Sequence, residues 1–393
     1  MTNLTSEPRV QEMVKQVEPI LRASAARSEA ERRLAPEAMN ALIDAGILRS
    51  LVPAAYGGAE LGPIAGLQLL EELAHIDSAA GWVAFICAAV ATFPALLPKQ
   101  AADEMLADPR AVCCGAWFPP GSAEPVQGGY RLSGRWSFGS GSNYAAWLTG
   151  QALVTENGTP VLGPDGRPTA LIVFFPAKDA QIIENWDTLG MRGTGSHDFQ
   201  VHDCFLPDYL AWPVGPWIPA NPAFSGPLYR IAVWYFSAVQ AIVALGIARA
   251  AVDDLLTLAQ TKTPSYTPTG LADKPVVQDK VARARAAVDA ARSYIHAATA
   301  EAEANVQTQQ RLTIEQGLPL ALSASYGIEA AVQAVDLVHS CAGTSGIRNT
   351  KRFQQYFRDV HTLSQHAFSS PSRFESAGKL MLGRESDWPF HYV

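Results

Sequence analysis

A run of alternating aromatic residues and the small polar residues after it, between positions 128 and 143, could together hold a flat ligand. The run from Tyr130 to Phe138 alternates between two faces after Gly128-Gly129, which predicts a strand that follows a hairpin turn. Gly139-Ser140-Gly141 comes next, where a backbone without bulky side chains can approach a ligand closely and offer a hydroxyl. An ordinary glycine-rich turn explains the same residues, so the rest of the chain must decide between the two interpretations.

Residues that commonly bind metals or form disulfides are scattered along the chain. The eight histidines include no H-x-x-x-H spacing with an acid between them, and the five cysteines show no C-x-x-C spacing. An odd number of cysteines with one adjacent pair, Cys113-Cys114, argues against a disulfide framework or a structural zinc site. We therefore expect buried thiols and no metal.

The composition is that of a globular protein with several domains. A chain of 393 residues exceeds what one hydrophobic core serves, so two or three domains are expected. With 30 basic and 37 acidic residues, the chain has no basic stripe for nucleic acid. The N-terminus is polar, and the apolar stretch from Gly81 to Leu97 is interrupted by Pro94 and Pro98, which predicts a buried helix. We expect a cytoplasmic protein without a membrane partner.

Helical and strand patterns divide the chain into three parts, which predicts an α+β protein. Residues 1–108 and 216–393 carry apolar residues at the spacing of helices, whereas residues 109–215 carry alternating runs typical of strands. Asp77-Ser78 is the predicted start of a helix over Ala79–Leu97. Strands are expected at Ala111–Phe118, Tyr130–Phe138, Trp147–Val154, Ala170–Phe175, Gln181–Trp186 and Phe199–Phe205.

This layout and four local motifs resemble the acyl-CoA dehydrogenase fold over essentially the whole chain. The motifs are Pro53–Gly58, Tyr130–Ser142, Thr188–Ser196 followed by Cys204–Pro207, and Arg352–His366. The resemblance implies an N-terminal helical domain over 1–108, a central β-barrel or sandwich domain over 109–215, and a C-terminal four-helix bundle over 216–393. It also implies a homotetramer.

Departures from the dehydrogenase pattern point to another branch of the same fold. A dehydrogenase needs a carboxylate base, but residues 366–371 and Tyr229–Val252 contain none, and the Arg-x-x-Phe-Gly signature for FAD is absent from Thr263–Asp279. The chain is more similar to the flavin-dependent monooxygenases, such as the oxygenase components of p-hydroxyphenylacetate hydroxylase and 3-hydroxy-9,10-secosteroid hydroxylase. Asp77–Trp82, Gly129–Gly141 and Arg358–His361 carry this second resemblance.

The resemblance to the monooxygenases implies a reaction and a set of partners. Such an enzyme takes reduced FMN or FAD from a separate flavin reductase, reacts it with O2 to form a C4a-hydroperoxyflavin, and hydroxylates a small aromatic substrate, most simply a phenol. The protein must keep water away from the reactive flavin. An FAD-dependent acyl-CoA dehydrogenase, an N- or S-oxygenating monooxygenase and a catalytically inactive scaffold stay open as alternatives.

The same resemblance assigns roles to individual residues. Ser140 and His366 are the expected catalytic residues, with Ser140 facing the flavin N5 and His366 acting as a neutral imidazole. The expected flavin-binding residues are Trp136, Phe138, Gly139, Ser140, Arg192, Thr194 and Ser196, and the expected substrate-binding residues are Trp82, Trp117 and His75. Core packing explains Trp136 equally well, and Arg358-Asp359 is expected to be a buried ion pair that fixes the bundle.

Overall fold

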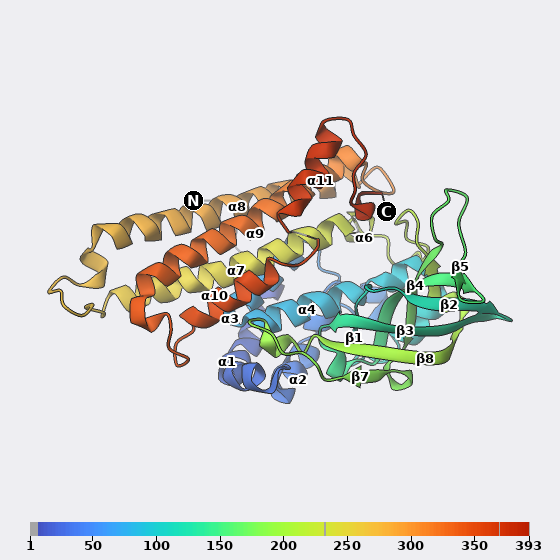
Figure 1. Cartoon of the computed structure of the whole chain (residues 1–393), viewed down its shortest axis with the longest axis horizontal. Helices are drawn as coiled ribbons and strands as arrows, with labels where there is room; N and C mark the ends of the chain where they lie inside the picture. The colour runs from blue at the N-terminus through green and yellow to red at the C-terminus, as the bar shows by residue number, and fades with distance from the viewer. Residues whose placement is uncertain (1–6, 232, 369, 393) are drawn as a thin grey trace.

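The computed structural model describes residues 7–231, 233–368 and 370–392, and its elements form three groups along the chain (Figure 1). The first group consists of the helices α1 (Pro8–Glu31), α2 (Pro36–Asp44), α3 (Pro63–Ile76), α4 (Ser78–Val90) and α5 (Lys99–Met105). The second group consists of the strands β1 (Cys113–Gly115), β2 (Gly121–Val126), β3 (Gly129–Gly139), β4 (Trp147–Glu156), β5 (Thr159–Pro160), β6 (Ala170–Pro176), β7 (Gln181–Ile183), β8 (His197–Pro207) and β9 (Ala211–Pro213). The third group consists of α6 (Leu228–Ile231), α7 (Val233–Ala259), α8 (Pro275–Asn305), α9 (Ile314–Ala342), α10 (Phe353–Leu363) and α11 (Ser372–Met381). The predicted α+β order of helices, strands and helices is confirmed.

The start of α4 follows the expected local chemistry, but its end differs from the prediction. Asp77 caps the helix by accepting a hydrogen bond from the Ala80 amide at 2.7 Å. The helix was expected to continue to Leu97, and it ends at Val90 instead. Pro94 explains the difference because its ring clashes with the carbonyl four residues earlier and it has no N–H to donate. The stretch Ser78–Leu96 is apolar enough to cross a membrane, yet 94% of it is buried inside the protein.

The central strands form one mixed sheet of nine strands in the order β7-β8-β3-β2-β4-β6-β9, with β1 and β5 also paired to β4. Strand β4 runs parallel to β1 and β2, and the other pairs are antiparallel. Trp136 lies in the core beside this sheet, fully buried between Phe175 and Phe199 at ring distances of 5.5 and 5.4 Å. A Cβ on Gly150 would lie 2.5 Å from the Trp136 indole, so glycine is needed there.

Phe138 leaves the face of the strand on which Trp136 lies. The alternating pattern places both residues on one face, but the pairing of β3 with β8 shifts register between Trp136 and Gly139. Phe138 has a φ of +70°, in the left-handed region that non-glycine residues rarely adopt. This bulge turns its ring outward, so Phe138 is 66% exposed while Trp136 is not exposed at all.

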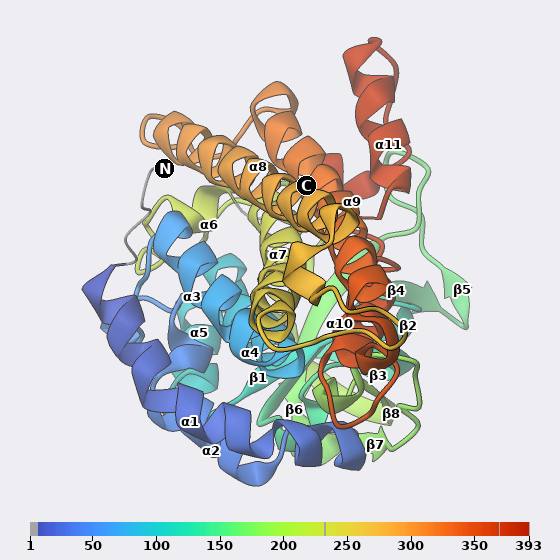
Figure 2. The same ribbon diagram turned by 90° about the vertical axis from the view of Figure 1, so that its left-hand side faces the viewer.

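The helical bundle packs against both other parts of the molecule. Helix α7 lies on α3 and α4 on one side and on α8 and α9 on the other, and Figure 2 shows it in the middle of this arrangement. A buried charge cluster joins these helices, because Glu71 is fully buried and binds Arg249 at 2.9 Å and Arg292 at 2.8 Å. Two arginines from α7 and α8 therefore compensate one buried carboxylate on α3.

Asp359 on α10 connects all three parts of the chain. One carboxylate oxygen accepts a hydrogen bond from the Met191 amide at 2.6 Å, and the other accepts one from the Ser78 hydroxyl. The prediction that Arg358 and Asp359 form an ion pair with each other is wrong. Arg358 instead binds Glu29 at 2.9 Å and the Leu189 carbonyl at 2.6 Å. Burial raises the pKa of the Asp359 carboxyl to about 6, against the hydrogen bonds from Ser78 and Met191.

We expect Asp359→Ala and Asp359→Asn to behave differently. The alanine variant leaves the Met191 amide and the Ser78 hydroxyl without a partner, and we expect it to lower the free energy of unfolding by about 2–4 kcal/mol. In the asparagine variant the amide oxygen can still accept from Met191 while its nitrogen donates to Ser78, so we expect a smaller loss. Chemical denaturation at pH 7 measures both values, and equal losses would contradict this account.

The pH dependence provides the matched control. As the pH falls, a carboxyl whose pKa is raised to about 6 in the folded protein binds a proton at a higher pH than the same carboxyl does in the unfolded chain. Wild-type stability relative to Asp359→Asn should therefore rise as the pH falls from about 6 to about 4, by up to ~3 kcal/mol. A difference between the two proteins that stays constant over this range would exclude Asp359 as the titrating group.

Candidate active site

A chain of hydroxyl groups runs below the outward-turned Phe138. The Trp82 indole N–H donates to Ser140 Oγ at 3.1 Å, and Ser140 Oγ lies 2.7 Å from Ser196 Oγ. Ser196 Oγ lies 2.6 Å from Thr194 Oγ1, which donates to the Met191 carbonyl at 2.8 Å. Three residues predicted to bind flavin are thus brought together, and they meet Trp82, which was predicted to bind substrate.

The two ends of this chain fix the direction of every hydrogen bond in it. An indole N–H can only donate a hydrogen bond, and a carbonyl oxygen can only accept one. Each hydroxyl in the chain therefore donates its hydrogen bond in the direction of Met191. Ser140 therefore donates to Ser196 and accepts from Trp82, which leaves one lone pair of its oxygen for another donor. Buried hydroxyls with every donor used form a rigid support, and the Ser140 oxygen can accept one more hydrogen bond.

His366 lies beside this chain, after the end of α10. Its ring is 5.3 Å from that of Trp82 and 5.9 Å from that of Phe368. The ring is half-buried, and its aromatic surroundings lower the pKa of His366 to about 4 because they disfavour the charged imidazolium. Nδ1 accepts a long hydrogen bond of 3.4 Å from the Phe368 amide, which leaves the proton of the neutral ring on Nε2.

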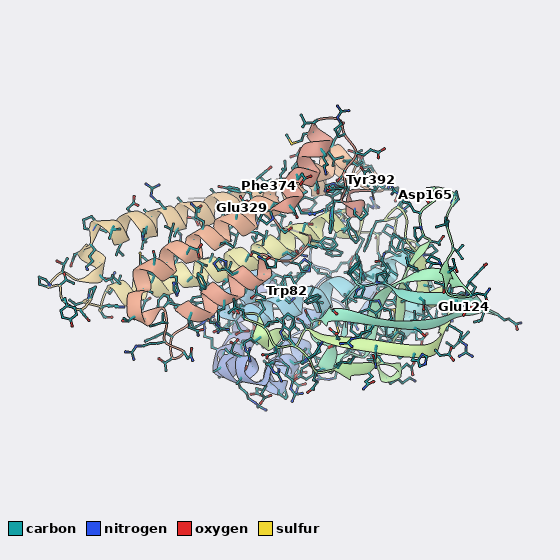
Figure 3. The ribbon with its side chains drawn as sticks, in the orientation of Figure 1. Trp82, Glu124, Asp165, Glu329, Phe374 and Tyr392 are labelled. Carbon is teal, nitrogen blue, oxygen red and sulfur yellow. The ribbon has the colours of Figure 1, made fainter. Side chains whose placement is uncertain are left out.

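Seven ring-bearing side chains from different parts of the chain form a closed circle, here called the aromatic circle. In order around the circle they are Trp82, Phe85, Phe236, Phe93, Trp117, Phe368 and His366, and neighbouring ring centroids are 5.3 to 6.4 Å apart. Figure 3 places Trp82 at the junction of the sheet and the helices. The circle offers aromatic faces and edges to a flat ligand, and its polar side is the pair of Trp82 and His366.

The surface around Phe138 fits a flat ligand with a polar tail. Phe138 meets Trp186 edge-on at 6.0 Å, and Leu189 in the same region is 64% exposed. Among the described residues, Ser142 Oγ and Asn143 Oδ1 are buried without a hydrogen-bond partner just beyond Ser140. Exposed apolar rings next to unpaired polar atoms suit a flavin, with its apolar ring system and polar ribityl chain.

Three predicted site residues are engaged elsewhere. Arg192 binds the Asp187 carboxylate at 3.1 Å and the Thr188 carbonyl at 2.9 Å, so its guanidinium is partly used inside its own loop. His75 lies 3.1 Å from Asp253, in the ion-pair network between α3 and α7, and the structure does not bring it into contact with the aromatic circle. Trp136 is removed from the set of ligand contacts because it is fully buried in the core.

Several residues of this region were not predicted from the sequence. Phe85, Phe93, Phe236 and Phe368 complete the aromatic circle. The first three stand in apolar stretches typical of core residues, and Phe368 stands among polar residues that give no sign of a site. Phe85 lies one turn after Trp82 on α4, and this helical spacing was the only local sign that both point the same way. For Phe236 and Phe368 the sequence carries no such sign, because their neighbours in the circle are distant along the chain.

Comparisons with known proteins show which family this chain resembles. Models of the N-terminal and the C-terminal domain of acyl-CoA dehydrogenases match residues 8–98 and 238–371. An indole-3-acetate monooxygenase from Pseudomonas putida is 30% identical over 366 residues, covering 93% of this chain and 91% of that protein. The oxygenase component of an FADH2-dependent resorcinol hydroxylase from Rhizobium is 27% identical, covering 93% of this chain and 92% of that protein. Among solved structures, XiaF from Streptomyces in complex with FADH2 has a TM-score of 0.87 at 24% identity and covers 97% of each chain.

The chain belongs to the acyl-CoA dehydrogenase fold family, as the sequence predicted. Within that family it is a flavin-dependent monooxygenase, an oxidoreductase that works as the oxygenase component of a two-component system. The first alternative, an FAD-dependent acyl-CoA dehydrogenase, is not supported by these relatives.

The hydroxyl chain makes a stability prediction of its own. Thr194→Val keeps the shape of the side chain but leaves Ser196 without its acceptor, so we expect the free energy of unfolding to fall by about 1–3 kcal/mol. Thr188→Val is the matched control, because the Thr188 hydroxyl donates to a carbonyl in the same loop at 2.9 Å outside this chain. Urea denaturation of both variants tests the idea, and a loss at Thr188 as large as at Thr194 would show that the chain adds nothing.

Proposed function

We propose that this monooxygenase hydroxylates an aromatic compound whose ring lies within the aromatic circle. The observation that carries the proposal is the closed circle itself, with the neutral His366 ring as one of its members. A flat apolar substrate gains both burial and ring contacts there. The names of the relatives support an aromatic substrate, since they act on indole-3-acetate and resorcinol.

The flavin is proposed to lie between the outward face of Phe138 and the hydroxyl chain. Phe138 would contact its ring system, Gly139 would allow the close approach of the backbone, and Ser140, Thr194 and Ser196 would set the polar edge. A Cβ on Gly139 would meet the Phe199 ring at 2.8 Å, so this position has no room for a side chain. Reduced FMN or FAD, when bound, would supply the two electrons that activate O2, and O2 would supply the oxygen atom that is transferred.

His366 is proposed to donate a hydrogen bond from Nε2 to the substrate. With its pKa near 4, the imidazole is neutral over the physiological range, and its Nε2–H can donate a hydrogen bond to an oxygen of the substrate. Its apolar neighbours also keep water from the same space, which protects a reactive cofactor. His366→Gln should therefore slow hydroxylation while leaving flavin binding intact.

The wider setting of the reaction is part of the same proposal. We infer that a separate flavin reductase supplies the reduced cofactor and that the oxygenase acts as a homotetramer in the cytoplasm. The five free cysteines are compatible with a reducing compartment.

Oxygen transfer can be measured directly. With a flavin reductase, NADH and ¹⁸O2, we expect one labelled oxygen atom in the product of an indole or a phenol, detected by mass spectrometry. His366→Gln should lower the rate about 10- to 100-fold. The same assay is also run with aromatic amines and aromatic sulfides as test compounds. Labelled N- or S-oxides without ring hydroxylation would replace the proposal by the N- or S-oxygenating alternative, and no labelled product from any compound would refute it.

Ser140 makes a prediction about the redox state of the bound flavin. N5 of a reduced flavin carries a hydrogen and can donate to the free lone pair of Ser140, whereas N5 of an oxidised flavin can only accept. We expect Ser140→Ala to weaken reduced-flavin binding about 5- to 30-fold and to change oxidised-flavin binding little. Anaerobic fluorescence titration gives both affinities. Ser137→Ala, on the strand β3 that ends just before Ser140, serves as the control, and equal losses for both redox states would exclude the N5 assignment.

A further inference from the structure

The C-terminal segment, residues 372–392, closes one side of the aromatic circle. It begins with α11 and then returns to the circle through Phe390. The Phe390 ring stacks on Trp117 at 5.4 Å and lies 4.6 Å from the ring of Phe368. Trp117 and Phe368 are neighbours in the circle, 6.3 Å apart, so Phe390 covers the place where these two members meet.

Phe390 is held in place from both sides along the chain. Trp388 lies 5.0 Å from it, and the Arg373 guanidinium lies 4.1 Å from the Trp388 ring centroid. His391 stacks on Trp234 of α7 at 5.0 Å, with the two rings 8° from parallel. Because the residues on either side are fixed by ring contacts, Phe390 forms a wall of the circle with little freedom to turn aside.

This wall is one ring thick. Phe390 and Phe368 both contact Trp117, and both also line a small cavity on the far side, under the C-terminal segment. The cavity has room for about one water molecule. Shortening Phe390 would add the space of a phenyl ring to it, because the surroundings of a deleted side chain relax only in part. The circle and the cavity would then be joined.

A substituent of a ring held in the circle can leave it sideways only between two of its members. The two widest spacings are those of Phe85 with Phe236, at 6.4 Å, and of Trp117 with Phe368, at 6.3 Å. The first lies between α4 and α7, which pack directly against each other, so no group can pass there. The second is covered by Phe390, and a larger substrate would meet this ring first.

We propose that Phe390 sets the upper size limit of the substrate, so that the enzyme takes ring compounds with small substituents and excludes those that extend a further ring past Trp117 and Phe368. The inference rests on the proposed function and deepens it, because it names a residue that decides which aromatic compounds enter. Phe390 limits the space from outside the circle and takes no part in oxygen transfer.

Phenols that differ by one ring test this limit on the full-length protein. We expect wild-type kcat/KM for 2-, 3- and 4-phenylphenol to lie about tenfold or more below that for the corresponding methylphenols. Phe390→Ala should raise the ratio of phenylphenol to methylphenol by about tenfold or more for at least one isomer, and Phe390→Leu should raise it less. A general loss of active protein cancels in this ratio. Calorimetric titration of the same compounds gives the ratio of affinities without turnover.

Phe374 provides the matched control. Figure 3 labels it on the same C-terminal segment, and like Phe390 it is half-buried. Within the described part of the chain, no ring contact joins Phe374 to the aromatic circle. Phe374→Ala removes the same side chain without opening the wall, so we expect it to leave the ratio unchanged.

The outcomes separate this proposal from the proposed function. Wild-type protein that takes phenylphenols as well as methylphenols, or Phe390→Ala that leaves the ratio unchanged, would overturn the size limit while aromatic hydroxylation stands. An equal rise in Phe374→Ala would show that loosening of the segment is the cause, and the proposal would fail. Tighter binding of a phenylphenol by Phe390→Ala, with no hydroxylation of any phenol by any of the proteins, would retain the size limit and refute the proposed function.

Discussion

The buried carboxylate of Asp359 is the contact on which the rest of the site depends. It accepts hydrogen bonds from α4 through Ser78 and from the loop before β8 through Met191, while it stands on α10 of the bundle. Each of the three parts of the chain thus contributes to one interaction in an interior where unpaired groups are costly. Only one relative position of the helices and the sheet satisfies all of these groups at once.

This fixed position determines what the hydroxyl chain and the aromatic circle can do. Met191 donates to Asp359 with its amide and accepts from Thr194 with its carbonyl, so the same residue anchors the hydroxyl chain that ends at Ser140. Trp82 stands one turn after Ser78 on α4 and joins that chain to the circle. A displacement of α10 would move His366 relative to Trp82, so the geometry of the site depends on a contact outside it.

Sequence reasoning was most accurate where local chemistry decides the structure and failed where tertiary packing decides it. The helix start at Asp77 and the strand Tyr130–Phe138 followed from capping and alternation. The resemblance to the family placed Ser140, Thr194 and Ser196 at one site, and the structure brings them together. The burial of Trp136 and the exposure of Phe138 could not be predicted from the sequence. Alternation places both residues on one face of the strand, but a bulge set by the pairing with β8 turns Phe138 away. His75 is a similar case, since its partner Asp253 lies on a helix 178 residues away along the chain.

The centre of the site carries no formal charge, and this limits which substrates it can distinguish. Burial keeps His366 neutral, and the neighbouring members of the aromatic circle carry no formal charge, so the reacting ring of a substrate meets apolar surfaces. Strong discrimination between similar apolar rings is difficult in such a pocket, since one methylene contributes only about 1–3 kcal/mol.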